Sequence, residues 1–242
     1  MTVLLLTFAA FATAVLSATL GLAGGLVLMG VFTWALPVPE AMVLHGLTQL
    51  LANGGRAVTL RAHLQTRGLL YYAGGAAFAA LVASLVAFSP PRAVVYLGIG
   101  LVPFVALAVP RSRHHDVATP TGAALAGLLV SGTQALFGVA GPILDVFFLS
   151  GRMERRAVVA TKAATQVVSH ALKILVFLPL VALDGRLGGL ALLCMAAAGL
   201  GTQVGTHILE RIPEATFLAW TRRVVLGVGG VYVCEGVWGL VG

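Results

Sequence analysis

The chain has 242 residues, of which 59 % are hydrophobic and only 10 % are charged, whereas about 25 % are charged in an ordinary soluble domain. The formal net charge is +7, yet no charged residue occurs in several windows about as long as a membrane-spanning helix: 1–39, 68–91, 93–110, 117–144 and 187–209. These features exclude a nucleic-acid-binding protein, a disulfide-stapled secreted domain and a disordered chain, and they predict an all-α polytopic membrane protein.

Eight apolar segments are expected to form about eight transmembrane helices, because prolines, glycines and charges bound each of them. In chain order they run over about 3–36, 40–63, 69–88, 94–109, 122–149, 155–183, 187–209 and 215–240. The chain is predicted to consist of a first transmembrane repeat over 1–110, a polar connecting loop over 111–120 and a second repeat over 121–242.

The first and fifth segments are too long for one simple span. A helix over 3–36 would be about 50 Å long at about 1.5 Å per residue, against about 30 Å of hydrocarbon. Either this helix tilts and protrudes, or it breaks at the glycine cluster 21–25 and turns inside the membrane. Clustered glycines destabilise a helix interior and favour the break. The fifth segment contains the same kind of break at 138–142, with a proline added.

The two breaks belong to an internal repeat. A shift of 117 residues without gaps superimposes the helix-breaking and polar residues of the first half on those of the second. The identities are Gly21 with Gly138, Ala23 with Ala140, Gly24 with Gly141, Thr48 with Thr165 and Gln49 with Gln166. Repeats with unwound helices in matching positions indicate a transporter's substrate site. The orientation stays open, since Arg is nearly balanced between alternate loops. This balance would suit inverted repeats, whereas an even number of spans per half predicts parallel ones, so the choice between them depends on the broken segments and stays open.

Each repeat carries one polar stripe. Five polar residues of the second segment recur every three or four positions and share one helix face: His45, Thr48, Gln49, Asn53 and Arg56. The sixth segment repeats the arrangement with Lys162, Thr165, Gln166, His170 and Lys173. Because such groups are costly in a bilayer, they are expected to face the bundle interior or a water-filled path.

The stripes indicate an anion, since they carry positive charge and hydrogen-bond donors but no carboxylate. Helices that start at the glycine breaks would also direct free N–H groups into them. The predicted substrate-binding residues are therefore those of the breaks and stripes: Gly21, Gly24, Gly25, Thr48, Gln49, Asn53, Arg56, Gly138, Gly141, Pro142, Lys162, Thr165, Gln166 and Lys173. His45, His170 and Asp145 are expected to handle coupling, and Asp145 has a second expected role as ion-pair partner of Lys162 or Lys173.

Structural explanations compete with each of these roles. Arg56 could snorkel to the membrane surface, and the Thr and Gln residues could join helices by hydrogen bonds. The span Gly201–Gly205 is better explained as a helix-packing motif. Lys162 and Lys173 are harder to explain structurally, because the chain has no lysine in its loops.

No motif for nucleotide hydrolysis, zinc hydrolysis, serine hydrolysis or thiol redox chemistry occurs in the sequence. We therefore expect no enzyme and no cofactor, but a secondary transporter driven by an ion gradient. The alternatives left open are a metal-ion permease, which would need clustered His, Asp or Cys ligands, and a non-transporting membrane assembly factor.

Several short motifs resemble the sulfite exporter TauE/SafE family. They are Gly21-Leu22-Ala23-Gly24-Gly25, Pro39-Glu40-Ala41, Thr48-Gln49, Gly138-Val139-Ala140-Gly141-Pro142, Ala160-Thr161-Lys162 with Thr165, Gly201-Thr202-Gln203-Val204-Gly205 and Glu210-Arg211-Ile212-Pro213. The resemblance implies a multi-pass permease of the inner membrane with two repeats that exports sulfite, sulfonates or related sulfur anions, with protons as coupling ion. Pro142, Asp145 and His45 depart from the family's pattern and bear on substrate choice. The expected partners are a small anionic substrate and the lipid bilayer, with no nucleic acid, and assembly as a homodimer is left open.

Overall fold

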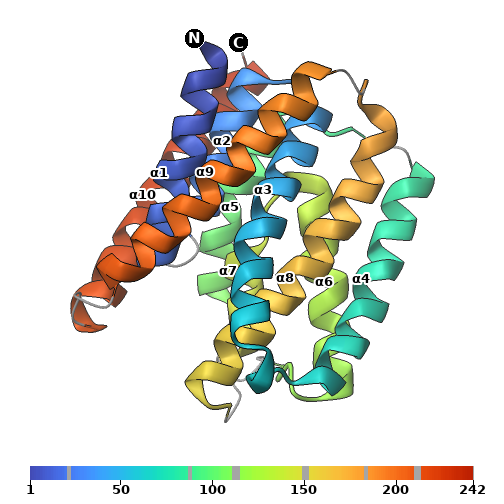
Figure 1. Cartoon of the computed structure of the whole chain (residues 1–242). Helices are drawn as coiled ribbons and strands as arrows, with labels where there is room; N and C mark the ends of the chain where they lie inside the picture. The colour runs from blue at the N-terminus through green and yellow to red at the C-terminus, as the bar shows by residue number, and fades with distance from the viewer. Residues whose placement is uncertain are drawn as a thin grey trace.

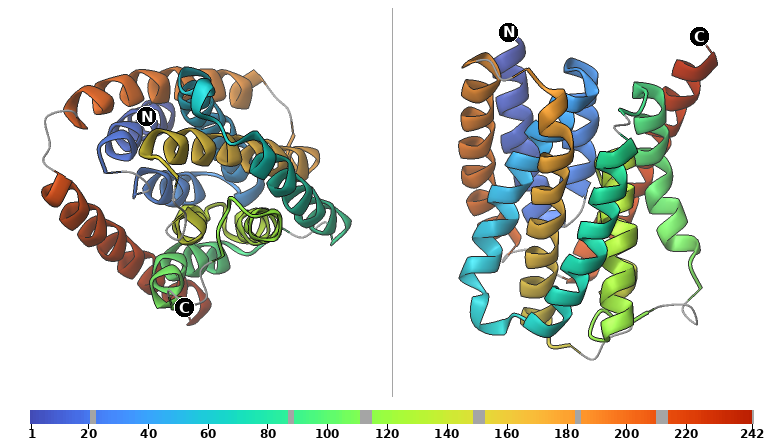
Figure 2. Two further views of the ribbon diagram at one scale, coloured as in Figure 1. Left: turned by 90° about the horizontal axis from the view of Figure 1, so that it is seen from below. Right: turned by 90° about the vertical axis from the view of Figure 1, so that its right-hand side faces the viewer.

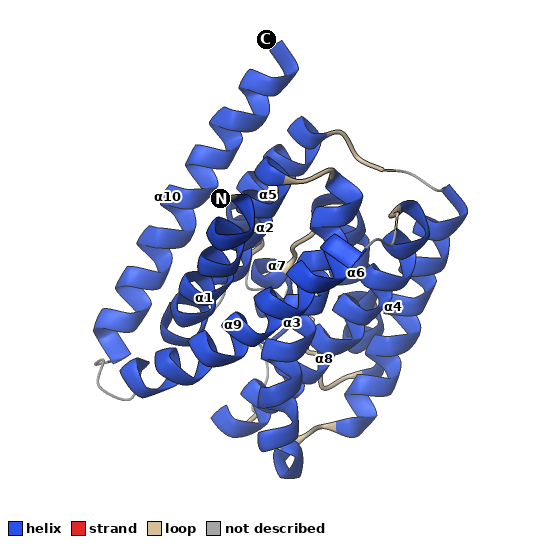
Figure 3. Ribbon diagram, turned by 45° about the horizontal axis from the view of Figure 1, so that its top comes forward, coloured by secondary structure: helices blue, strands red, loops and turns tan. Residues whose placement is uncertain are grey.

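The computed structural model describes residues 1–20, 23–86, 89–110, 115–148, 153–182, 185–209 and 214–241. The described chain is helical and contains no strand (Figure 3). Its α-helices are α1 (Thr2–Leu20), α2 (Ala23–Ala35), α3 (Val38–Thr59), α4 (Thr66–Val86), α5 (Arg92–Ala108), α6 (Pro120–Phe137), α7 (Gly141–Phe148), α8 (Arg155–Phe177), α9 (Gly185–Leu209) and α10 (Glu214–Val241). Short 3₁₀ turns follow α3 (η1, Arg61–His63) and α8 (η3, Leu178–Leu180).

Both overlong segments are broken into two helices, as the glycine clusters predict. The first segment forms α1 and α2, and the fifth forms α6 and α7. The described residues therefore contain ten α-helices, where eight segments were expected, and the difference lies in these two breaks.

Each broken segment is a hairpin whose second helix runs back beside the first. In Figure 1, α1 descends from the N-terminus and α2 returns upward, whereas α6 rises from the opposite end and α7 returns downward. The backbone N–H of Val117, ahead of α6, donates to the carbonyl of Phe147 at the end of α7 over 3.1 Å. Each hairpin thus begins and ends on one side, and the two hairpins enter from opposite sides (Figure 2).

The helices pack in a pattern that repeats between the two halves. Helix α1 packs against α9 as α6 packs against α4, and α3 contacts α9 as α8 contacts α4. Helices α3 and α8 pack against each other, as do α5 and α10. The pattern of main contacts is therefore preserved when α1–α5 are exchanged for α6–α10. Seen from below, α9, α10 and α4 lie at the rim and α8 lies near the middle (Figure 2).

Five of the described helices are long and apolar enough to cross a membrane: α1, α4, α8, α9 and α10. Helices α2 and α5 are apolar but shorter. Two exposed tryptophans, Trp220 and Trp238, lie 18 residues apart on α10, which corresponds to about 27 Å along a helix. Tryptophans gather at the two surfaces of a bilayer, so this spacing matches a hydrocarbon layer of about 30 Å.

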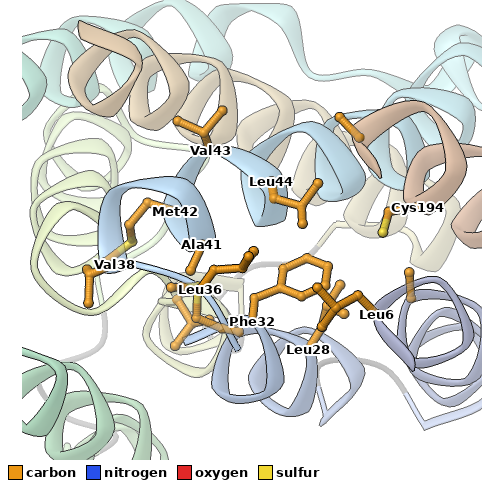
Figure 4. Packing of buried hydrophobic residues seen from close by; sticks show 14 of the residues in the cluster. Leu6, Leu28, Phe32, Leu36, Val38, Ala41, Met42, Val43, Leu44 and Cys194 are labelled. Atoms are coloured by element: carbon orange, nitrogen blue, oxygen red, sulfur yellow. The ribbon is translucent and has the colours of Figure 1, made fainter. Parts of the chain in front are cut away.

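Apolar packing fixes the hairpins to the long helices. The larger core cluster joins α1, α2, α3 and α9 through residues that include Leu6, Leu28, Phe32, Leu44 and Cys194 (Figure 4). A second cluster around Tyr72 and Leu144 joins α4, α6 and α7. Such close packing holds the ends of the hairpins in fixed positions beside α3 and α8.

Small residues let α1 and α9 approach closely. A Cβ atom on Gly201 would collide with the carbonyl of Phe11, and one on Gly205 would lie 2.6 Å from the carbonyl of Val15. The packing role expected for Gly201–Gly205 is therefore confirmed.

Candidate functional site

The two polar stripes meet at His45, His170 and Lys173, where α3 packs against α8. These helices run antiparallel, since Gly46 of α3 lies against His170 and Ile174, and Gly54 lies against Val167. The rings of His45 and His170 meet edge to face with centroids 5.5 Å apart. The stripe residues that are at least nine-tenths buried are His45, Thr48, Asn53, Thr165, Gln166, His170 and Lys173. The prediction that both stripes face the bundle interior is confirmed for these residues.

A continuous hydrogen-bond chain joins the two hairpins through the stripes. His45 Nε2 lies 3.1 Å from the carbonyl oxygen of Gly25 in the first hairpin. Lys173 Nζ lies 2.8 Å from His45 Nδ1 and 2.9 Å from the carbonyl oxygen of Gly138 in the second hairpin. A carbonyl can only accept, so Nε2 of His45 bears the proton and Nδ1 accepts from the lysine. The chain therefore runs from Gly25 through His45 and Lys173 to Gly138.

Gly138 ends α6 in a conformation that only glycine adopts easily. Its φ is +78°, in the left-handed region, and its N–H donates to the carbonyl of Gln134 over 2.8 Å. A Cβ at this position would lie 2.5 Å from the sulfur of Met29, on the other hairpin. The glycine thus allows close contact between hairpins and leaves its carbonyl for Lys173.

The other residues of the breaks have different environments. Gly24 lies against the carbonyl of Thr13 and against Ser17, so it serves the packing of α2 on α1. Gly25 has space toward Gln49 and His45. Gly141 and the buried Pro142 begin α7, and Gly21 lies outside the described residues.

Lys162 pairs with Asp145 of α7, which settles the choice of lysine partner left open by the sequence. The Lys162 side chain is 25 % exposed and that of Asp145 is 36 % exposed. Among the described residues, no carboxylate lies within ion-pair distance of Lys173. One lysine of the stripe is therefore neutralised locally, whereas the other is held by a histidine and a carbonyl.

Lys162 and Lys173 lie at two different heights along the axis of α8, which are called the Lys162 level and the Lys173 level. They lie 11 residues apart on α8, or about 16 Å along the axis, which is too far for one small anion to touch both. The antiparallel contact places Arg56 of α3, half-buried, at the level of Lys162, as His45 is at the level of Lys173. The predicted charges therefore lie at two separate positions along α8 and not in a single pocket.

The threonine hydroxyls bond within their own helices. Thr48 donates to the carbonyl of Leu44 and Thr165 to that of Lys162, each over 2.8 Å. The Asn53 amide donates to the carbonyl of Gln49 over 3.0 Å. In this arrangement the two hydroxyl protons are occupied, so the threonines offer a ligand only their lone pairs.

Four polar residues of this region were missed by the sequence analysis. Gln134 of α6 donates from Nε2 to Gln166 Oε1 over 3.1 Å. Ser169 lies 2.6 Å from the hydroxyl of Tyr72 and 2.9 Å from that of Ser131. Gln134 precedes Gly138 by one helical turn and Ser169 precedes His170, so both were near residues already singled out. Tyr72, in a plainly apolar segment, gave no such signal.

A cavity of about 650 Å³ opens at the end of the molecule where α3 passes into α4. It is lined by Ala62, His63, Leu64, Gln65, Asp116, Ala118, Met153, Glu154 and Ala157. Ala157 lies five residues before Lys162 on α8, or about 7.5 Å along the helix. The Lys162 level is thus near an open surface, whereas Lys173 is 2 % exposed.

The part of the chain that the structure describes contains no group of three or more His, Cys, Asp or Glu residues able to hold a metal ion. Clustered ligands of that kind are what the metal-permease alternative requires. The polar groups around His45 and Lys173 are instead side-chain nitrogens and backbone carbonyl oxygens.

The family model for sulfite exporter TauE/SafE matches residues 6–233, which include both hairpins and both stripes. The chain belongs to the sulfite exporter TauE/SafE family. This confirms the resemblance drawn from the short glycine and threonine motifs. Comparison with curated proteins and with solved structures gave no match.

Membership in the TauE/SafE family, together with the apolar helices, makes this chain a multi-pass membrane transporter. The family consists of permeases, which is consistent with the expectation that the chain is not an enzyme. In this transporter, the hairpins and stripes bring a buried charge, Lys173, next to irregular backbone at Gly138.

Proposed function

We propose that the chain is a secondary transporter that exports a small sulfur-containing oxyanion, sulfite or an organosulfonate, across the inner membrane. The observation that carries this proposal is the position of Lys173. Its amino group is buried between the ends of two hairpins and lacks a carboxylate partner among the described residues. A buried cation of this kind is costly unless a counter-ion visits it, so it marks an ion pathway.

The transporter is proposed to consist of two inverted repeats over 1–110 and 121–242, joined by the loop 111–120. Three observations support this arrangement: the 117-residue sequence shift, the exchangeable packing of the two halves and the opposite entry of the two hairpins (Figure 1). Inverted repeats with broken helices near the bilayer midplane are a common architecture of secondary transporters. Alternating access would then arise from motion of one half against the other.

The substrate would pass between two cationic levels. Lys162 and Arg56 form the level nearer the cavity, and Lys173 with His45 forms the buried level about 16 Å away. Gly25 and Gly138 would let the anion approach the backbone, and Gln49 and Gln166 would supply amide donors. An anion that left one level would be attracted by the other.

Coupling to protons is proposed to act on the partners of the two lysines. A second proton on His45 would remove the lone pair that accepts from Lys173 and would repel its ammonium group. Protonation of Asp145 would likewise release Lys162 from its ion pair. Either event would free a lysine for an anion, which links proton entry with substrate binding.

The test is sulfite efflux and counterflow in proteoliposomes with Lys162→Ala and Lys173→Ala. Each variant is expected to lower the flux at least tenfold, because a charge-assisted contact is worth about 1.5–3 kcal/mol. Arg186→Ala is the matched control, since this cation is exposed at the start of α9. If both lysine variants transport sulfite as the wild type does, the proposed charge site is wrong.

A further inference from the structure

Among the hydrogen-bonded contacts that join α6 and its C-terminal end to α8, two lie on either side of His170 along α8. One is the amide pair of Gln134 and Gln166, with 3.1 Å between Nε2 and Oε1. The other joins Lys173 Nζ to the carbonyl of Gly138 over 2.9 Å. His170 lies between these contacts, four residues after Gln166 and three before Lys173 on α8. These positions place His170 on the same face of α8 as both contacts.

Two buried polar atoms next to these contacts have no hydrogen-bond partner among the described residues. They are Oε1 of Gln134, whose residue is 1 % exposed, and Nδ1 of His170, whose residue is 3 % exposed. A buried polar atom without a partner costs about 1–3 kcal/mol, so two at neighbouring positions require an explanation.

The orientation of the amides does not remove this deficit. If both glutamine amides are turned over, Gln134 accepts from Gln166, and its own N–H groups become the buried atoms without a partner. In either orientation one end of Gln134 is used by Gln166 and the other end is left for something else.

The neighbouring hydroxyl groups are already satisfied. The Ser169 hydroxyl lies 2.6 Å from that of Tyr72 and 2.9 Å from that of Ser131, so the three residues form one polar layer between α4, α6 and α8. The 117-residue shift matches Ser131, Ser169 and Tyr72 with Ala14, Ala52 and Gly189, which carry no polar side chain. The polar layer between α4, α6 and α8 therefore has no counterpart at the matching positions of the repeat.

We propose that Gln134 and His170 contact the substrate and form the neutral half of an oxyanion site beside Lys173. This inference rests on the proposed function and deepens it. Lys173 supplies the charge. With both glutamine amides turned over, Gln134 accepts from Gln166 and presents its N–H groups to the anion, and His170 donates from Nδ1 in the tautomer that protonates it. The ligand class is a small oxyanion of sulfite or sulfonate-headgroup size, whose several oxygens accept these donors.

The experiment measures sulfite affinity by calorimetry with the full chain in lipid nanodiscs. Gln134→Leu is expected to raise the Kd at least tenfold, and Gln134→Glu at least a hundredfold because it adds a negative charge. The matched control is Gln203→Leu, on the exposed face of α9, with an unchanged Kd. Ser131→Ala is the structural control: it opens the polar layer and lowers the melting temperature, but leaves the Kd within twofold.

The outcomes separate this inference from the proposed function. If Lys173→Ala weakens sulfite binding and Gln134→Leu leaves it within twofold, the Gln134 contact is overturned and the transporter proposal stands. If the wild type binds and transports neither sulfite nor sulfonates, both are overturned. If Gln134→Leu does not fold, Gln134→Asn replaces it, with an expected Kd increase of at least threefold, and an unchanged Kd overturns the contact.

Discussion

Replacing Gly138 by alanine tests whether the second hairpin end must have its observed backbone. The residue has φ +78°, and an L-residue with a Cβ costs about 1–2 kcal/mol there. The new methyl group would also lie 2.5 Å from the Met29 sulfur, and overpacking of this kind costs about 1–3 kcal/mol. Together the two effects predict a loss of about 2–5 kcal/mol in local stability.

The loss is expected to appear in both folding and transport, because the Gly138 carbonyl accepts from Lys173. Thermal unfolding in detergent and sulfite flux in proteoliposomes measure the two effects. The control is Gly132→Ala, six residues earlier on α6, where a Cβ meets nothing within 4 Å. That change should be neutral or stabilising by about 0.5–1 kcal/mol, since alanine favours a helix more than glycine does.

The reasoning about this turn would be refuted by a Gly138→Ala protein with the melting temperature and flux of the wild type. The contributions of backbone strain and of crowding against Met29 can also be separated. Met29→Ala removes the crowding but not the backbone strain, so the double variant should recover only the part of the loss that comes from the sulfur contact.

Three further changes test other contacts. Asp145→Asn removes the charge that neutralises Lys162, so the half-saturating sulfite concentration in a flux assay should fall about three- to tenfold; an unchanged value would show that this pair does not affect anion binding. Tyr72→Phe deletes the hydroxyl that bonds Ser169 and should cost about 1 kcal/mol in thermal unfolding, whereas Tyr71→Phe, on an exposed side chain, should be silent. Gly205→Leu should lower the melting temperature by separating α1 from α9, and a stable variant would contradict the close contact seen there.

The sequence predicted those features that follow from helix periodicity and from the cost of charge in a membrane. The spacing of His45, Thr48 and Asn53 places them on one face, and the structure buries all three. The glycines at 21–25 and 138–142 predicted breaks, and both overlong segments are broken there.

Features that depend on which helices meet could not be predicted in the same way. Tyr72 belongs to the site only because α4 packs against α6 and α8, and nothing in its own segment indicates this. The two threonine hydroxyls could bond across helices or within one, and local geometry selects the second option here. The direction of each hairpin also depends on tertiary packing, since a glycine break permits either a kink or a full reversal.

The hairpins also determine on which side of the molecule each half of the chain begins and ends. A unit made of one hairpin followed by three further helices starts at one side and finishes at the other, because the hairpin returns to its own side. A second copy fused in frame therefore begins where the first one ended and inserts upside down without any change in its loops. Both chain ends then lie at the same surface, as they do in Figure 1, so reporters fused to either end should respond to the same compartment.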